Sequence, residues 1–82
     1  MLKYWLEIID ENGYYKYLYK IDNLEELGFL VVDPKTYKII DHTDATKGIL
    51  FEGARHAYNF MRRKQQRLNM TDLPKEGTAH WY

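Results

Sequence analysis

Residues 2–21 read LKYWLEIIDENGYYKYLYKI, and this stretch decides the fold. The dipeptide Asn12-Gly13 favours a type I′ turn, because both central residues of that turn need a positive φ angle. Apolar side chains alternate with polar ones on both sides of the dipeptide, as they do in strands that bury one face. A two-residue loop pairs Glu11 with Tyr14, Ile8 with Tyr17 and Tyr4 with Ile21. The resulting hairpin buries a face made of Leu2, Tyr4, Leu6, Ile8, Tyr17, Tyr19 and Ile21.

A second hairpin is predicted downstream of the first. Asp33-Pro34 favours a type I turn between the apolar runs 29–32 and 37–40. Only Lys38 is polar along these two arms, so either both faces are covered or one edge pairs with another element. Between the hairpins, Asp22 as a cap and Gly28 as a left-handed exit predict a short helical turn over residues 22–28.

One long helix is predicted to begin between Ala45 and Ile49 and to end near Leu68. At 100° per residue, one side of this helix carries an apolar stripe of Leu50, Ala54, Ala57, Met61 and Leu68. Gly53 lies beside the stripe, where the absence of a side chain lets the helix approach the sheet, at a cost of about 1 kcal/mol in helix propensity relative to alanine.

The elements together predict an α+β fold. It consists of a four-stranded antiparallel sheet, made of two β-hairpins joined by a short helical turn, packed against one long C-terminal α-helix. Residues 1–68 form a single compact domain in this prediction. Residues 69–82 show no clear periodicity, and we expect them to be an extended or loosely ordered C-terminal tail.

Composition narrows the chemistry that is open to the chain. It has 82 residues and lacks both cysteine and serine, so a disulfide framework, a thiolate zinc site and the two commonest covalent nucleophiles are excluded. We therefore expect no enzymatic activity, no cofactor and no metal site. No apolar run approaches the roughly 20 residues that span a bilayer, and no export signal is recognisable, so we expect a cytoplasmic protein without membrane contact.

Charge is distributed unevenly along the chain, although the net charge is zero. Residues 1–44 hold nine acids and five bases, a net charge of −4, and residues 45–82 hold three acids and seven bases, a net charge of +4. Between residues 53 and 70 there are five bases and no acid. Such a segment attracts an acidic protein surface or phosphates, although basic side chains near a helix C-terminus also complement the helix dipole.

Phe60 singles out one side of this basic helix as a candidate binding surface. It lies on the helical wheel near arginines and away from the apolar stripe, and aromatic and arginine side chains are enriched at protein interfaces. Trp5, with Ile9, Leu18 and Tyr14, makes a second patch on the outer face of the first hairpin, which faces solvent, a second subunit or residues 80–82. The predicted partner-binding residues are Arg55, His56, Phe60, Arg62, Arg63, Arg67 and Trp5.

Three hypotheses about function follow. The leading one is a small non-enzymatic protein–protein interaction module that binds an acidic surface, and inhibition of a larger host protein, in the manner of small phage or mobile-element proteins, is one role open to it. The alternative is a nucleic-acid-binding protein that uses helix residues 55–67, against which the zero net charge counts. An enzyme would need His42 and His56 in one cleft, and capping by Asp44 explains the sequence around His42 better than a metal site does. Homodimerisation is also expected, because the second hairpin is apolar on both arms.

Overall fold

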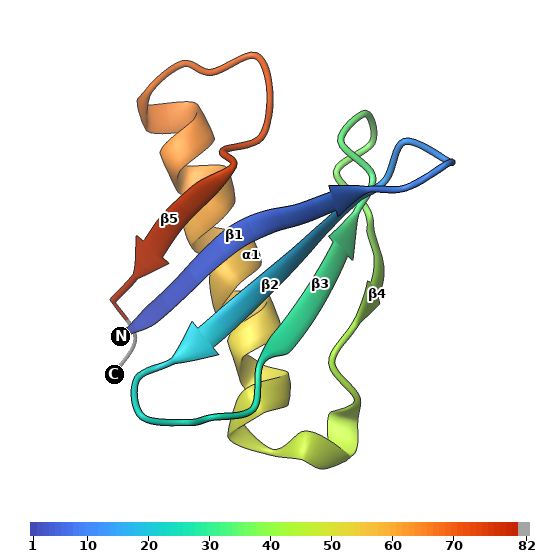
Figure 1. Ribbon diagram of the computed structural model, residues 1–82. Coiled ribbons are helices and arrows are strands. Elements are labelled where there is room, and N and C mark those ends of the chain that lie inside the picture. Colours follow the sequence, from blue (N-terminus) through green and yellow to red (C-terminus); the bar gives the residue numbers. More distant parts are fainter. Residues whose placement is uncertain (81–82) are drawn as a thin grey trace.

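The computed structural model describes residues 1–80 of the chain and has one sheet and one long helix (Figure 1). The strands are β1 (Leu2–Ile9), β2 (Tyr15–Ile21), β3 (Gly28–Val32), β4 (Ile39–His42) and β5 (Glu76–Ala79), and the helices are the 3₁₀ helix η1 (Ala45–Lys47) and the α-helix α1 (Ile49–Arg67). The predicted α+β class is confirmed, and so is the long helix.

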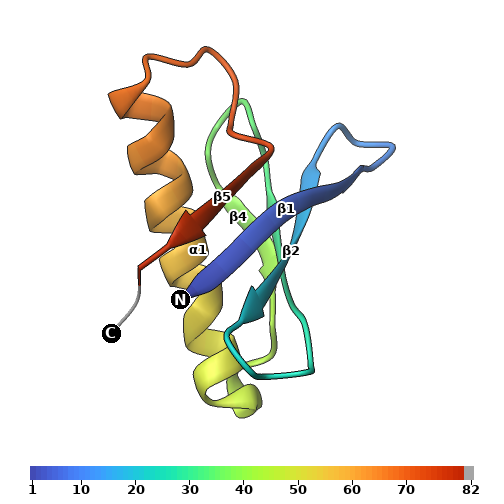
Figure 2. The same cartoon turned by 60° about the vertical axis from the view of Figure 1, so that its left-hand side comes forward.

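The sheet has five strands in the order β4-β3-β2-β1-β5, and all neighbours are antiparallel. The prediction of four strands was wrong, because residues 76–79, within the segment expected to be a tail, pair with β1. For the same reason α1 is not the C-terminal element. Figure 2 shows α1 lying across one face of the sheet, with β5 on the sheet edge closest to the viewer. No helix within residues 1–80 is long and apolar enough to cross a bilayer.

The first hairpin forms, but its loop is longer than predicted. The Asp10 and Tyr14 backbones close the loop, and the Asp10 carboxylate accepts hydrogen bonds from the backbone N–H groups of Asn12 and Tyr14 at 2.8 and 2.9 Å. These side-chain bonds favour a three-residue loop, in which only Gly13 has a positive φ, of 80°.

The register of this hairpin therefore differs from the prediction. Tyr4 pairs with Tyr19 rather than with Ile21, and a bulge between Leu6 and Ile8 adds one residue to β1. A shift of two residues leaves side chains on their original face, so the predicted face is buried over most of its length. Ile8 is the exception, 55% exposed, because the bulge changes its direction.

The second hairpin forms, but its second arm is residues 39–42 rather than the predicted 37–40, because the turn extends to the Lys38 carbonyl, which accepts from the Asp33 N–H. The helical turn predicted for residues 22–28 is absent. Asp22 has a φ of 32°, which is incompatible with the extended conformation of an N-cap. Its carboxylate binds the Met1 amino group at 2.8 Å, and the Lys20 ammonium donates to the backbone carbonyls of Asp22 and Leu24. These contacts hold the segment as a turn.

Helix α1 packs closely on the sheet through small residues. A Cβ atom added at Gly53 would lie 2.6 Å from the Tyr19 ring and 2.9 Å from Ile21 Cδ1, which confirms the predicted close approach. Leu50, Ala54, Ala57 and Met61 are buried as predicted. Leu68 is not, because it is the C-cap where the chain leaves the helix, and Gln65 occupies the buried position one turn earlier.

Three tyrosines form the middle of the core, and two of them use their hydroxyl groups to fasten other segments to the sheet. Tyr4, Tyr17 and Tyr19 are almost fully buried. The Tyr17 hydroxyl donates to the Pro74 carbonyl at 2.9 Å, which ties the segment before β5 to β2. The Tyr19 hydroxyl donates to the Leu50 carbonyl and is 2.8 Å from the Thr43 hydroxyl. The abundance of tyrosine is thus largely structural.

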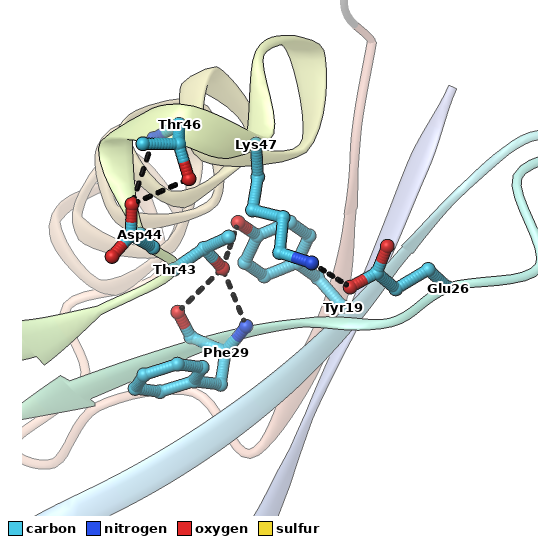
Figure 3. A network of polar contacts seen from close by, with 7 residues as sticks. All are labelled: Tyr19, Glu26, Phe29, Thr43, Asp44, Thr46 and Lys47. Carbon is cyan, nitrogen blue, oxygen red and sulfur yellow. Dashed lines mark hydrogen bonds and ion pairs between the residues drawn. The ribbon is translucent and has the colours of Figure 1, made fainter.

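Thr43 links the end of β4 to the sheet and to the helix start (Figure 3). Its hydroxyl accepts from the Phe29 N–H at 2.9 Å and contacts Tyr19. The next residue, Asp44, caps η1 by accepting from the Thr46 N–H and hydroxyl at 2.8 Å, and these bonds hold the pKa of the Asp44 carboxyl below its usual value. Asp44 is thus a helix cap as predicted, but of η1, whereas Gly48 is the N-cap of α1.

Candidate functional site

The predicted binding residues on α1 lie on two different flanks of the helix. Arg55 and Arg62 lie on the flank toward β4 and the β3–β4 turn. Phe60, Arg63 and Arg67 lie on the flank toward β5. The helical spacing places the two sets on opposite sides of the buried stripe: Phe60 is about 140–160° from Arg55 and Arg62 around the helix, at 100° per residue, whereas Arg63 lies between them.

Arg62 contacts other residues of the protein and does not present its guanidinium group as part of a free cationic surface. Its guanidinium carbon is 3.6 Å from the centre of the Tyr37 ring, a stacking geometry. Tyr37 is itself held by Tyr58, whose hydroxyl donates to the Tyr37 carbonyl at 2.7 Å, and by Gln65, whose amide donates to the Tyr37 hydroxyl at 3.1 Å. Arg62 therefore braces the β3–β4 turn against α1.

A groove runs between α1 and β5, and we call it the α1–β5 groove. Its volume is about 490 Å³, and it is lined by Tyr4, Phe60, Arg63, Lys64, Arg67, Gly77, Thr78 and His80. Gly77 is required at this place, because a Cβ atom there would lie 2.3 Å from the Tyr4 hydroxyl oxygen. The structure thus brings Phe60, Arg63 and Arg67 together, as the helical wheel predicted, and adds Lys64 and β5.

The electrostatics of the α1–β5 groove are one-sided. No carboxylate lines it, and the ion pairs within residues 1–80, Met1 with Asp22 and Lys47 with Glu26, lie elsewhere. The Arg63 guanidinium lies 5.3 Å from the centre of the Phe60 ring. Lys64 donates to the backbone carbonyl of Glu76 at 2.8 Å. The groove therefore combines an aromatic wall with cations that no carboxylate of the described chain neutralises.

His56 and Arg55 are not part of this groove. His56 lies on the same side of α1 as Phe60 and is half-buried, but it does not line the groove. Arg55 lines a cavity of about 290 Å³ on the other side of the helix, together with Ile39, His42 and Phe51. His42 lines this cavity and His56 does not, so the two histidines are not brought together there. Within residues 1–80, no cluster of three His, Asp or Glu side chains is placed to hold a metal.

Trp5 lies on the sheet face opposite α1. It pairs across strands with Leu18, and Leu18 pairs with Phe29, so the three half-buried side chains form one row over β1, β2 and β3. The Trp5 indole N–H donates to Glu7 at 3.4 Å. Trp5 and Phe60 therefore belong to separate surfaces. Of the C-terminal residues considered as a cover for Trp5, residues 81 and 82 lie outside the described part of the chain.

Sequence reasoning missed the contribution of β5 and of Lys64. Lys64 follows Phe60 by four residues, so a helical wheel centred on Phe60 includes it. No comparable signal marks Gly77 and Thr78, whose position depends on pairing with β1. Comparison with models of protein families, with curated proteins and with solved structures found no match.

Proposed function

We propose that this protein is a non-enzymatic binding module that recognises an acidic protein surface through the α1–β5 groove. The observation that supports the proposal is the composition of the groove, which Phe60 lines together with Arg63, Lys64 and Arg67 and which no acidic side chain of residues 1–80 lines. Arginine and aromatic side chains supply most of the binding energy at many protein interfaces. The cations accelerate the encounter with an acidic partner, and the aromatic wall slows dissociation.

Inhibition is a natural use of such a module. A small protein that covers an acidic surface prevents any other basic ligand from reaching it. The predicted inhibitor role remains part of this proposal, and so does the cytoplasmic location in which we expect the partner. The partner itself is defined here only by its chemistry, an acidic polypeptide surface.

Nucleic acid is the second candidate ligand, favoured by the five bases between residues 53 and 70. The structure divides these bases, since Arg62 stacks on Tyr37 and Arg55 lies on the opposite flank from the groove. Three cations in one groove make a short footprint for a phosphate backbone, and the net charge of the chain is zero. An acidic protein surface therefore fits the groove better.

The test is a titration followed by fluorescence anisotropy with two labelled probes, polyglutamate and single-stranded oligothymidylate. We expect the protein to bind polyglutamate in low salt. The double variant Arg63→Glu/Arg67→Glu should lose this binding, because it reverses two of the three cations of the groove. The matched control is Lys38→Glu/Arg55→Glu, which changes the net charge by the same amount outside the groove.

Each outcome decides between the candidates. Loss in the groove variant with retention in the control supports the proposal. Equal loss in both variants would show that binding depends on overall charge and would contradict the groove assignment. Binding of the oligonucleotide in preference to polyglutamate would replace the proposal with nucleic-acid recognition. The slope of log binding constant against log salt concentration, about −0.7 per phosphate contact, would then give the number of phosphate contacts.

A further inference from the structure

Strand β5 presents an open backbone edge beside the groove. The Leu6 N–H donates to the Lys75 carbonyl at 2.7 Å, so Lys75 faces β1. Backbone groups alternate in direction along an antiparallel strand, so Gly77 and Ala79 also face β1, whereas the N–H and C=O groups of Glu76 and Thr78 point away from it. The bond from Lys64 to the Glu76 carbonyl confirms this direction.

This edge is unpaired within residues 1–80. Strand β5 ends the sheet order, and Lys64 supplies the one hydrogen bond found there, so the N–H groups of Glu76 and Thr78 and the Thr78 carbonyl have no partner in the described chain. An edge of this kind is a template for another strand. Figure 1 shows β5 as the outermost strand on its side of the sheet, with α1 behind it.

The α1–β5 groove lies where the side chains of an added strand would enter. Gly77 and Ala79 share the helix-facing side of the sheet with their partners Tyr4 and Leu2, and their small size leaves room between β5 and the helix. A strand next to β5 would lie about 4.8 Å from it and would direct every second side chain toward the helix. Those side chains would meet Phe60, Arg63 and Arg67.

We propose that the partner contributes an extended acidic segment that adds to β5 as a sixth, antiparallel strand, with its carboxylates directed into the α1–β5 groove. The inference rests on the proposed function and specifies how the partner is recognised. Backbone hydrogen bonds to Glu76 and Thr78 supply affinity, and the cations supply specificity for acidic side chains. Lys64 leaves the Glu76 carbonyl and turns to a carboxylate of the incoming strand.

Charge complementarity selects this occupant over a second copy of the chain. Two copies paired through β5 would bring two basic grooves together, and like charges in opposition disfavour such a pair. An acidic segment instead compensates Arg63, Lys64 and Arg67 at once.

The test uses a labelled eight-residue peptide that alternates Glu and Thr, and two derivatives methylated on backbone nitrogen. In an added antiparallel strand, the residues that form backbone hydrogen bonds with Glu76 and Thr78 direct their side chains to the same face of the sheet as Glu76 and Thr78 do. When the Glu side chains of the peptide enter the groove on the other face, these hydrogen-bonded residues are its Thr residues. Methylation of the Thr amides should weaken binding by at least about tenfold, because each removes a backbone donor worth roughly one power of ten. Methylation of the Glu amides should leave binding within about twofold.

A variant of the protein tests the same hydrogen bonds from the other side. Thr78→Pro removes an N–H group that β1 does not use, so the fold should persist and peptide binding should fall by about tenfold. Thr78→Ala keeps the N–H group and should bind like the original protein. Thermal unfolding of both variants checks the fold. If the proline variant does not fold, the methylated peptides still test strand addition.

The outcomes separate the inference from the proposed function. Weakening confined to the Thr-methylated peptide supports strand addition. Equal effects of the two methylation patterns, the reverse pattern, or binding of polyglutamate without binding of the peptide would overturn strand addition and leave the proposed function standing. Binding of neither acidic probe would overturn both.

Discussion

Gly53 decides how closely α1 and the sheet pack, and two opposing effects meet at this residue. Gly53→Ala should gain about 1 kcal/mol of helix propensity. The new Cβ would lie 2.6 Å from the Tyr19 ring, which cannot move freely because its hydroxyl is bonded to Leu50 and Thr43. Overpacking costs about 1–3 kcal/mol, so we expect a net loss of about 1 kcal/mol in urea unfolding.

The control for this prediction is Asn59→Ala at an exposed position of the same helix. It has the propensity gain without the contact and should raise stability by a few tenths of a kcal/mol, about the difference between the two residues. If Gly53→Ala were also stabilising, the helix would lie farther from the sheet than the structure places it.

Thr43 is the second residue whose chemistry can be isolated. Thr43→Val keeps the shape of the side chain but removes the hydroxyl that accepts from the Phe29 N–H and contacts Tyr19. A buried donor left without a partner costs about 1–3 kcal/mol, and we expect a loss in that range in urea unfolding. Thr43→Ser keeps the hydroxyl and should lose less. A larger loss in the serine variant would assign the role of Thr43 to its methyl group.

At the scale of elements, β5 and the segment before it belong to the core. Leu73, Pro74 and Ala79 are buried, and Pro74 accepts a hydrogen bond from Tyr17. Burial of Leu73 alone contributes about 1.5–3 kcal/mol, and a chain of this size has only about 4–12 kcal/mol of net stability. A chain ending at residue 68 should therefore show no cooperative thermal unfolding by circular dichroism.

A chain ending at residue 80 is the matched control, because it keeps every contact described above and should unfold cooperatively. Cooperative unfolding of the shorter chain at a similar temperature would contradict this prediction. It would instead support an independent domain over residues 1–68, as expected from the sequence alone.

Patterns of sequence predicted the elements that carry their own periodicity. Alternation around Gly13 indicated β1 and β2, and the 3.6-residue spacing from Leu50 to Met61 indicated α1. Strand β5 lacks such a signal, because its inward residues are Gly77 and Ala79, whose fit depends on Tyr4 and Leu2. The loop at Asp10 was mispredicted for a related reason, since its carboxylate competes with the two-residue turn.

The candidate site, like the fold, was predictable from the sequence only where a single element determines it. The helical wheel grouped Phe60 with Arg63 and Arg67 correctly, because one helix determines their relation. It could not show that Arg62 stacks on Tyr37, a residue of another segment. The half of the groove contributed by β5 depends on long-range pairing and was beyond sequence reasoning.

The expected homodimer is a prediction for the edge at the other end of the sheet. Strand β4 is an edge strand, and Ile39 and Ile40 are 40% and 44% exposed. Light scattering at rising concentration should show a dimer, since exposed apolar edges favour pairing. Ile40→Lys should shift the equilibrium to monomer, and Lys35→Ala, at an exposed position of the adjoining turn, should not. A monomer at all concentrations would contradict the prediction.

At the scale of the whole molecule, the tyrosine-rich core makes the free energy of unfolding depend on pH in the alkaline range. Burial raises the pKa of Tyr4 from 10.0 to about 12, and burial also raises the pKa values of Tyr17 and Tyr19. Above pH 10 the unfolded chain loses tyrosine protons that the folded chain keeps, so the contribution of these tyrosines to the free energy of unfolding should be constant below pH 10 and fall as the pH rises toward 12. Urea midpoints across this range, with tyrosinate absorbance as a second readout, measure the effect. Tyr4→Phe removes one of the three groups and should reduce the slope, whereas a midpoint that stays constant up to pH 12 would show that the buried hydroxyls ionise without unfolding.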